Sequence, residues 1–233
     1  MDHLPRLLGT PRPGGDLIVV AVPAEAAGLA ELAPVLVTGV GRLAAAAALA
    51  GHLGRGPRPG RILNAGTAGA LCDGPGFAPG TVHRIGRVHL HDYPHAVIAG
   101  LAGADPHPPL HPDPAPGAVR LATGDAFVAD PVTRARLARD ADLVDMEGYA
   151  VAWVAARAGI PARLVKVVSD AAGGDGDAAA AWAAAVPRCA ALLAGRLGAR
   201  GARRPGRRVS GSARRAAPGS SPGSPGGAAS ASG

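Results

Sequence analysis

The chain of 233 residues is 48% hydrophobic but only 3% aromatic, so it is long enough to bury a sizeable core, which small aliphatic side chains must fill. Its net charge of +7 comes from the C-terminal end, because residues 196–233 hold eight arginines and no acid. The rest of the chain has sixteen basic against seventeen acidic residues, which excludes a strongly basic nucleic-acid-binding domain.

The composition divides the chain into three parts. Residues 1–15 are predicted to be an N-terminal extension, residues 16–195 the folded domain, and residues 196–233 a disordered tail rich in Arg, Gly, Pro and Ser. Two cysteines give neither a disulfide framework nor metal spacing, and we expect no signal peptide and no membrane span. We therefore expect a cytoplasmic protein with no membrane partner. We expect no contact with nucleic acid other than non-specific contact through the tail.

Within the domain, short apolar runs alternate with alanine-rich segments. The runs are typical of buried strands and the alanine-rich segments of helices, which favours a three-layer αβα fold around a mixed, mostly parallel sheet. Asp130 and Pro131 begin one helix, Gly159 closes another, and a bend or an interruption of the last helix is expected near Pro187. In chain order, strands are predicted within 16–22, 34–41, 61–71, 81–90, 118–127, 142–146 and 161–170, and helices within 23–32, 42–53, 130–140, 147–159 and 178–195.

Acidic side chains stand where these predicted strands end. Asp145 and Glu147 lie between a strand and a helix, Asp170 lies at the end of the next strand, and glycine turns are predicted at 39–41 and 66–69. Ligands bind outside the carboxyl ends of the strands in such sheets, so these acids can share one rim. Taken singly, Asp145, Glu147 and Asp170 could be helix caps, and Glu25 an exposed acid in the first turn of a helix.

Several motifs, read in order, resemble the nucleoside phosphorylase/nucleosidase superfamily, and most of all its methylthioadenosine/S-adenosylhomocysteine nucleosidases. These motifs are "LVTGVGRLAAAAAL", "ILNAGTAGAL", "ATGDAFVADP", "VDMEGYAVAWVAARAGIP" and "LVKVVSDAA", within residues 16–195. The "DMEG" stretch, the "SD" pair and "TGDAF" are the most specific of them. The resemblance implies a phosphorylase/hydrolase-like fold, a homodimer, a nucleoside substrate, and no metal or organic cofactor.

The resemblance also implies roles for individual residues. Asp170 would protonate or hydrogen-bond to the departing base, and Glu25 would activate water; these are the expected catalytic residues. Glu147 would hold the ribose hydroxyls, and Asp170 would need a raised pKa, which we expect from burial beside other acids. The expected substrate-binding residues are Glu147, Met146, Asp145, Thr67, Phe127, Val128 and Trp182.

Two positions depart from the family pattern, because Asp145 stands where relatives often have Glu and Lys166 where many have Arg. Water is preferred to phosphate as the nucleophile because neither "AVPAEAAG" (21–28) nor "NAGTAGA" (64–70) contains a basic residue. Arg42 or Arg61 reaching the site would weaken that preference. The alternatives are a futalosine hydrolase, a purine nucleoside phosphorylase, and a non-catalytic nucleoside-binding protein.

Overall fold

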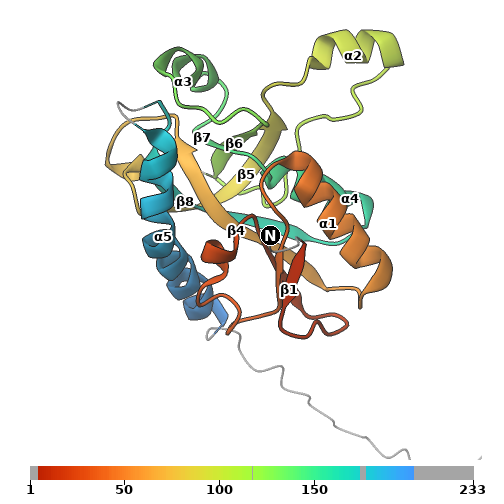
Figure 1. Ribbon diagram of the computed structural model, residues 1–233. Helices are drawn as coiled ribbons and strands as arrows, with labels where there is room; N and C mark the ends of the chain where they lie inside the picture. Colours follow the sequence, from red (N-terminus) through yellow and green to blue (C-terminus); the bar gives the residue numbers. More distant parts are fainter. Residues whose placement is uncertain (1–4, 117, 174–176, 202–233) are drawn as a thin grey trace, which may run out of the picture. The chain divides into compact units, whose positions relative to one another are not determined.

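The computed structural model describes residues 5–116, 118–173 and 177–201. They all belong to one compact unit, Met1–Arg203, and the remainder of the predicted tail lies outside the described residues. The predicted α/β architecture is confirmed: helices lie on both faces of a mixed sheet of eight strands (Figure 1). The strands are β1 Arg6–Leu8, β2 Asp16–Val20, β3 Val35–Val37, β4 Arg61–Ala70, β5 Val82–Leu90, β6 Val119–Thr123, β7 Leu143–Asp145 and β8 Ala162–Ala171.

Most neighbouring strands run parallel. The parallel pairs are β2–β3, β2–β4, β4–β8, β5–β6 and β6–β7, whereas β1–β3, β4–β7 and β5–β8 are antiparallel. Because β4 pairs with both β7 and β8, the strands β4, β7, β6, β5 and β8 close into a ring. This ring brings the carboxyl ends of β4, β6, β7 and β8 to one place.

The helices are sorted onto the two faces by the alternation of apolar side chains along the strands. Leu17 and Val19 of β2 point to the face covered by α1 (Arg42–Arg55) and α4 (Gly148–Arg157). Ile18 and Val20 point to the other face, which is covered by the 3₁₀ helix η1 (Pro23–Ala26) and by α5 (Ala178–Gly201). A strand with a side-chain period of two and both faces buried must be apolar on both faces, as β2 is from Leu17 to Val20.

The remaining short elements lie toward the edges of the unit: the 3₁₀ helix η2 Pro75–Phe77, α2 His95–Ala102 and α3 Pro131–Leu137. The Asp130 side chain caps α3 by accepting a hydrogen bond from the backbone N–H of Thr133, as the sequence predicts. Helix α2 projects from the body in Figure 1 and contains no buried residue.

Some predicted elements differ from the observed ones. The predicted helix 23–32 is only the short η1 followed by turns, since Gly28 has a positive φ of 72° and the chain bends there. The predicted glycine turn at 66–69 is extended strand, because β4 pairs with β8 along its whole length. At the ends, β1 lies within the predicted N-terminal extension, and α5 continues past residue 195 to Gly201 without ending at Pro187.

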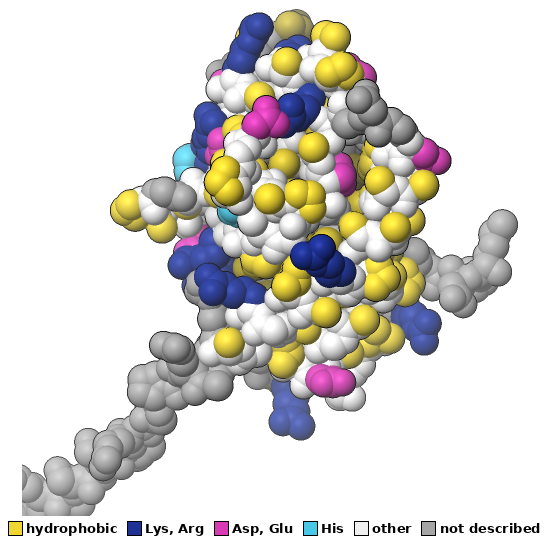
Figure 2. Space-filling model, turned by 90° about the vertical axis from the view of Figure 1, so that its left-hand side faces the viewer, with side chains coloured by type: hydrophobic (Ala, Val, Ile, Leu, Met, Phe, Trp, Pro, Cys, Tyr) yellow, Lys and Arg dark blue, Asp and Glu magenta, His cyan; other side chains and the backbone are white. Residues whose placement is uncertain are grey.

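Helix α5 bears on the prediction that no segment spans a membrane. In the described part of the chain it is the one helix, over Ala178–Ala199, that is long and apolar enough to do so, which is weak evidence taken alone. One side of it packs on the sheet through Val186, Cys189 and Leu193. Figure 2 views the molecule from the side on which α5 lies in Figure 1 and shows small hydrophobic side chains interspersed with basic ones.

Candidate active site

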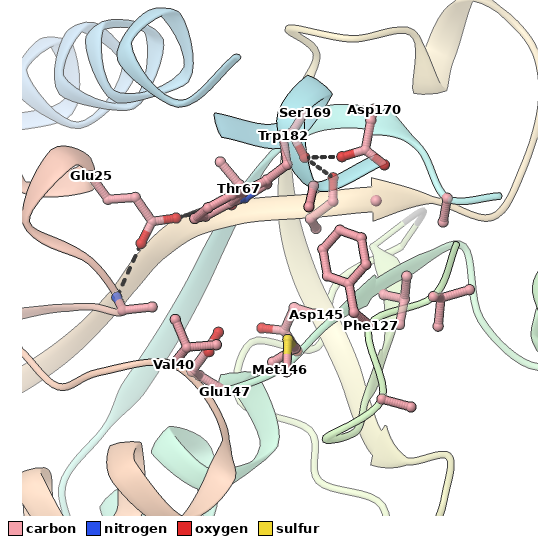
Figure 3. A pocket seen from close by; sticks show the side chains of 18 residues that line it. Glu25, Val40, Thr67, Phe127, Asp145, Met146, Glu147, Ser169, Asp170 and Trp182 are labelled. Carbon is pink, nitrogen blue, oxygen red and sulfur yellow. Dashed lines mark hydrogen bonds between the residues drawn. The ribbon is translucent and has the colours of Figure 1, made fainter. Parts of the chain in front are cut away.

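A cavity of about 230 Å³ lies at the carboxyl ends of the strands (Figure 3). It is lined by residues that follow β2, β3 and β6, by the ends of β4, β7 and β8, and by the first turns of α5. All nine residues that the sequence analysis proposed for the site line this cavity: Glu25, Thr67, Phe127, Val128, Asp145, Met146, Glu147, Asp170 and Trp182.

Glu25 is buried, with 3% of its surface exposed, and is fixed by hydrogen bonds from both sides. Its Oε2 accepts from the backbone N–H of Ala21 at 3.0 Å, just after β2. Its Oε1 accepts from the backbone N–H of Thr67 at 2.9 Å and from the Thr67 hydroxyl at 3.0 Å. The carboxylate therefore bridges β2 and β4 at the edge of the cavity, and it is not the exposed acid of a helix's first turn.

Thr67 connects this carboxylate to the last helix. The indole N–H of Trp182 donates to Thr67 Oγ1 at 2.9 Å, which leaves the hydroxyl proton of Thr67 free to donate to Glu25. The chain of hydrogen bonds that runs from Trp182 through Thr67 to the accepting carboxylate of Glu25 joins α5, β4 and η1, and it holds all three side chains in one orientation.

Asp145 is placed differently from its predicted role in substrate binding. Its Oδ1 accepts from the hydroxyl of Thr123 at 2.6 Å, and its Oδ2 accepts from the backbone N–H of Gly148 at 2.8 Å. Oδ2 also lies 2.7 Å from Nζ of Lys166, and only 1% of the Asp145 side chain is exposed. Asp145 therefore caps α4 and pairs with Lys166, and both of its oxygens are engaged by the protein.

Glu147 has one oxygen engaged by the backbone. Its Oε1 accepts from the N–H of Gly41 at 2.8 Å, at the glycine turn before α1. Burial raises the pKa of Glu147 first, and repulsion from Asp145 raises it further, while attraction to Lys166 lowers it; the pKa lies at about 7. Glu147 is therefore a buried acid that changes charge near neutral pH.

Asp170 comes from the end of β8, where the hydroxyl of Ser169 donates to its Oδ2 at 2.6 Å. A Cβ on Gly69 would lie 3.4 Å from its other oxygen, so the absence of a side chain at this position leaves room beside the carboxyl group. Asp170 is only half-buried, although we expected burial beside other acids. In Figure 3 it lies across the cavity from Glu147.

The remaining walls of the cavity are apolar. Met146 lies between the two acids of its motif, and Val128 is buried beneath the loop that follows β6. Phe127 and Val40 also line the cavity but keep 46% and 51% of their surface exposed, so they lie at its mouth. Apolar walls with a few fixed polar groups are typical of small-molecule sites.

Basic side chains are absent from the lining of this cavity as far as the described residues extend. Arg42 is beside the mouth, but its guanidinium is held by Asp92 at 2.8 Å and by Asp125 at 2.8 Å. Arg61 pairs with Asp16 at the opposite, amino-terminal ends of β2 and β4. Neither arginine reaches the cavity, which removes the observation that would have favoured a phosphate pocket.

Sequence reasoning missed several residues that shape the site. Ser169 was seen only as part of the "SD" pair, and Lys166 only as a departure from the family pattern. Val40 and the N–H of Gly41 lie in a glycine-rich turn whose signal was read as a turn alone. Thr123, which orients Asp145, begins the "TGDAF" stretch, but the sequence analysis assigned it no role of its own.

Comparisons with known proteins agree with this fold. Residues 117–197 match the model of the phosphorylase superfamily. A 5'-methylthioadenosine/S-adenosylhomocysteine nucleosidase of Treponema pallidum (strain Nichols) is 47% identical over 60 residues, which are 25% of this chain and 22% of that protein. A protein of the same name from Arabidopsis thaliana is 35% identical over 120 residues, which are 48% of this chain and 47% of that protein. The matches thus span less than half of each relative.

Among solved structures, the S-adenosylhomocysteine nucleosidase of Streptococcus pyogenes in complex with 5-methylthiotubericidin has a TM-score of 0.65. It is 22% identical to this chain and covers 80% of it, and 95% of that structure is matched. The likeness at this identity concerns the fold. The predicted resemblance is confirmed: part of the chain matches the phosphorylase superfamily model, and the chain is similar in sequence to two 5'-methylthioadenosine/S-adenosylhomocysteine nucleosidases and in fold to a solved nucleosidase.

Proposed function

We propose that the protein is a nucleosidase that hydrolyses the N-glycosidic bond of a purine nucleoside, such as 5'-methylthioadenosine or S-adenosylhomocysteine, and releases the base. One observation carries this proposal: Glu25, Glu147 and Asp170 are far apart in the sequence but line one cavity that has no basic residue in its described lining. Cleavage of this bond builds positive charge on the sugar and negative charge on the departing base. Acids in separate environments can serve these two charges.

The sugar is assigned to Glu147. Because Gly41 occupies only one of its oxygens, the carboxylate has acceptor capacity left for the two ribose hydroxyls. Met146 is beside it and offers an apolar surface to the ribose ring. Holding the sugar in a fixed orientation supplies much of the rate enhancement in such reactions.

The base is assigned to the side of the cavity where Asp170 and Phe127 lie. Asp170, in its protonated form or through a donated hydrogen bond, would neutralise the purine as it leaves. The Ser169 hydroxyl fixes the orientation of this carboxyl group. Phe127 and Val128 would pack against the planar base, because flat aromatic and aliphatic surfaces suit a purine.

The nucleophile is assigned to a water molecule at Glu25. The N–H groups of Ala21, Val22 and Thr67 and the Thr67 hydroxyl hold this carboxylate in one position at the cavity, so a water molecule that it binds has a fixed place. Water is favoured over phosphate because a phosphate dianion needs cationic or N–H donors. Arg42 and Arg61, the nearest arginines in sequence, are both engaged by aspartates.

A panel of nucleosides tests the proposal. Methylthioadenosine, S-adenosylhomocysteine, futalosine and inosine are each incubated with the full chain, with and without phosphate, and base release is measured by chromatography. We expect base release from an adenine nucleoside without phosphate. A strict need for phosphate would favour a phosphorylase. Ligand-dependent melting with no product at any pH would favour a non-catalytic binder.

The protein is further proposed to be a cytoplasmic homodimer. Helix α2 has no buried residue although it is apolar, and Val97 and Leu101 are 61% and 80% exposed, which suits a surface covered by a second copy. Light scattering coupled to size-exclusion chromatography measures the oligomeric state, and a monomer at all concentrations would contradict this assignment.

A further inference from the structure

Lys166 is the only lysine in the sequence, where every other basic residue is an arginine. Among the residues that the structure describes, its side chain is also the largest that is fully buried, with 1% of the residue's surface exposed. Lysine carries a compact charge, whereas the planar guanidinium of arginine needs several donors satisfied. A lone lysine at a fully buried position of the sheet indicates a specific electrostatic task.

The surroundings of Lys166 are acidic. Asp145, Glu147 and Glu25 are all buried, at 7%, 8% and 3% exposure, and all three line the cavity next to β8. Burial acts to lower the pKa of Lys166, but attraction to Asp145 and then to Glu147 outweighs it, so the pKa lies above its usual value. Lys166 is thus a permanent cation among three carboxylates.

Asp145 fixes where that charge lies. Its Oδ2 is 2.7 Å from Nζ of Lys166, and the hydroxyl of Thr123 and the N–H of Gly148 hold the aspartate itself. These contacts come from β6, from the start of α4 and from β8, which are all parts of the rigid core. An ion pair in such a setting has little freedom to move, and both oxygens of Asp145 are engaged by the protein.

Gly66 leaves a gap between Lys166 and Glu25. A Cβ at this position of β4 would lie 3.1 Å from Oε1 of Glu25 and 3.5 Å from Nζ of Lys166. The ammonium and the Glu25 carboxylate therefore face each other across a space that only glycine leaves open. Lys166 is accordingly within the electrostatic reach of all three acids.

We propose that Lys166 is a positioning residue that acts through Glu147: its buried ammonium, locked in place by Asp145, offsets the surrounding negative charge so that Glu147 can ionise and accept hydrogen bonds from a ligand. The charged groups that face Glu147 are Asp145 from β7, Lys166 from β8 and Glu25 from η1, and Gly41 adds a backbone N–H. Only Lys166 and Gly41 favour the ionised form. The proposed function explains why this ionisation is useful, but the ionisation itself can be measured without turnover.

The sequence makes that measurement direct, because the chain contains three glutamates, Glu25, Glu31 and Glu147, and no glutamine. When glutamate is labelled with ¹³C at Cδ, the NMR spectrum of the full chain contains three side-chain carboxyl signals. The signals of Glu31 and Glu147 are assigned by their loss in Glu31→Gln and in Glu147→Gln. The pKa of Glu147 is then read from its titration in the wild type, in Lys166→Met and in Asp145→Asn. Arg55→Met, which removes an exposed cation of α1, is the matched control.

The two variants should move the pKa of Glu147 in opposite directions. Lys166→Met should raise the pKa of Glu147 by about 1 or more, because it removes a nearby positive charge. Asp145→Asn should lower this pKa by about 1, because it removes a nearby negative charge. Lys166→Arg and Arg55→Met should leave it near the wild-type value. If Lys166→Met does not fold, Lys166→Gln, which also lacks the charge but keeps a polar group near Asp145, takes its place, and a Glu147 pKa that stays at the wild-type value in Lys166→Gln would overturn the proposal.

The proposal is overturned if the pKa of Glu147 stays the same in Lys166→Met, or if it moves in the same direction in Lys166→Met and in Asp145→Asn. An electrostatic effect reverses with the sign of the charge removed, whereas loosened packing would act in the same way in both variants. If the shifts occur but no nucleoside is cleaved, the inference on Lys166 stands and the proposed function fails. If nucleosides are cleaved but the pKa does not move, the inference fails and the proposed function stands.

Discussion

The raised pKa of Glu147 makes the stability of the protein depend on pH in a predictable way. The pKa is about 7 in the folded chain and 4.5 for an ordinary glutamate. Between these two values the folded state holds a proton that the unfolded state has already lost. The free energy of unfolding should therefore fall as the pH rises through this window, and the stability that is present below pH 4.5 should be lost once the pH has passed 7.

The size of this effect follows from the difference between the two pKa values. A difference of about 2.5 corresponds to about 3 kcal/mol as an upper limit, because Glu147 is coupled to Asp145 and Lys166. In Glu147→Gln the side chain does not titrate, so this dependence should disappear. The variant should gain stability relative to the wild type as the pH increases from about 5 to about 8, by up to about 3 kcal/mol.

Urea unfolding at about pH 5 and about pH 8 measures the change in the free energy of unfolding between these pH values for the wild type, for Glu147→Gln and for Glu31→Gln. Glu31 is exposed, so its variant should follow the wild type at both pH values and serves as the matched control. If Glu147→Gln and the wild type change in parallel between the two pH values, Glu147 does not hold a proton near neutrality, and the electrostatic description of the site is wrong.

Three further substitutions probe the other contacts of the site. Asp170→Asn should lower the rate of base release by about 10²–10⁴-fold with little change in melting temperature, and wild-type turnover in this variant would contradict its assigned role. Thr67→Val removes the hydroxyl that donates to Glu25 and should lower turnover about 10-fold, whereas Thr67→Ser keeps a hydroxyl and should keep the wild-type turnover. Equal rates in Thr67→Val and Thr67→Ser would show that this hydrogen bond is dispensable. Gly66→Ala should destabilise the protein by about 1–3 kcal/mol in urea unfolding, because its methyl group would lie only 3.1 Å from Oε1 of Glu25, which hydrogen bonds hold in place. Gly54→Ala, where nothing lies within 4 Å of the added methyl group, should not destabilise it. Equal stabilities of the two variants would refute the crowding at Gly66.

Much of the fold could be predicted from the sequence because its local signals agree with one another. The apolar runs of β2 and β8 and the alanines of α1 match their observed elements closely. Local signals failed where tertiary pairing decided the conformation. The glycines of β4 are typical of a turn, but hydrogen bonds to β8 hold them in a strand.

The candidate site was predictable in its members but not in their partners. Sequence motifs indicated Asp145 and Lys166 as two separate departures from the family pattern, whereas in the structure they form one ion pair. This pairing depends on β7 and β8 lying on either side of β4, a strand order that the sequence does not specify. For the same reason, the contact of Trp182 with Thr67, which joins residues 115 positions apart, could not be inferred from either motif.

The proposal that water attacks a nucleoside in this cavity is tested most directly by product stoichiometry in phosphate-free buffer. Free adenine and reducing sugar are measured together after incubation of the full chain with 5'-methylthioadenosine. The proposed function predicts equal amounts of the two products and no change in the rate when phosphate is added. Adenine that appears only with phosphate, together with a sugar phosphate in place of the reducing sugar, would contradict it.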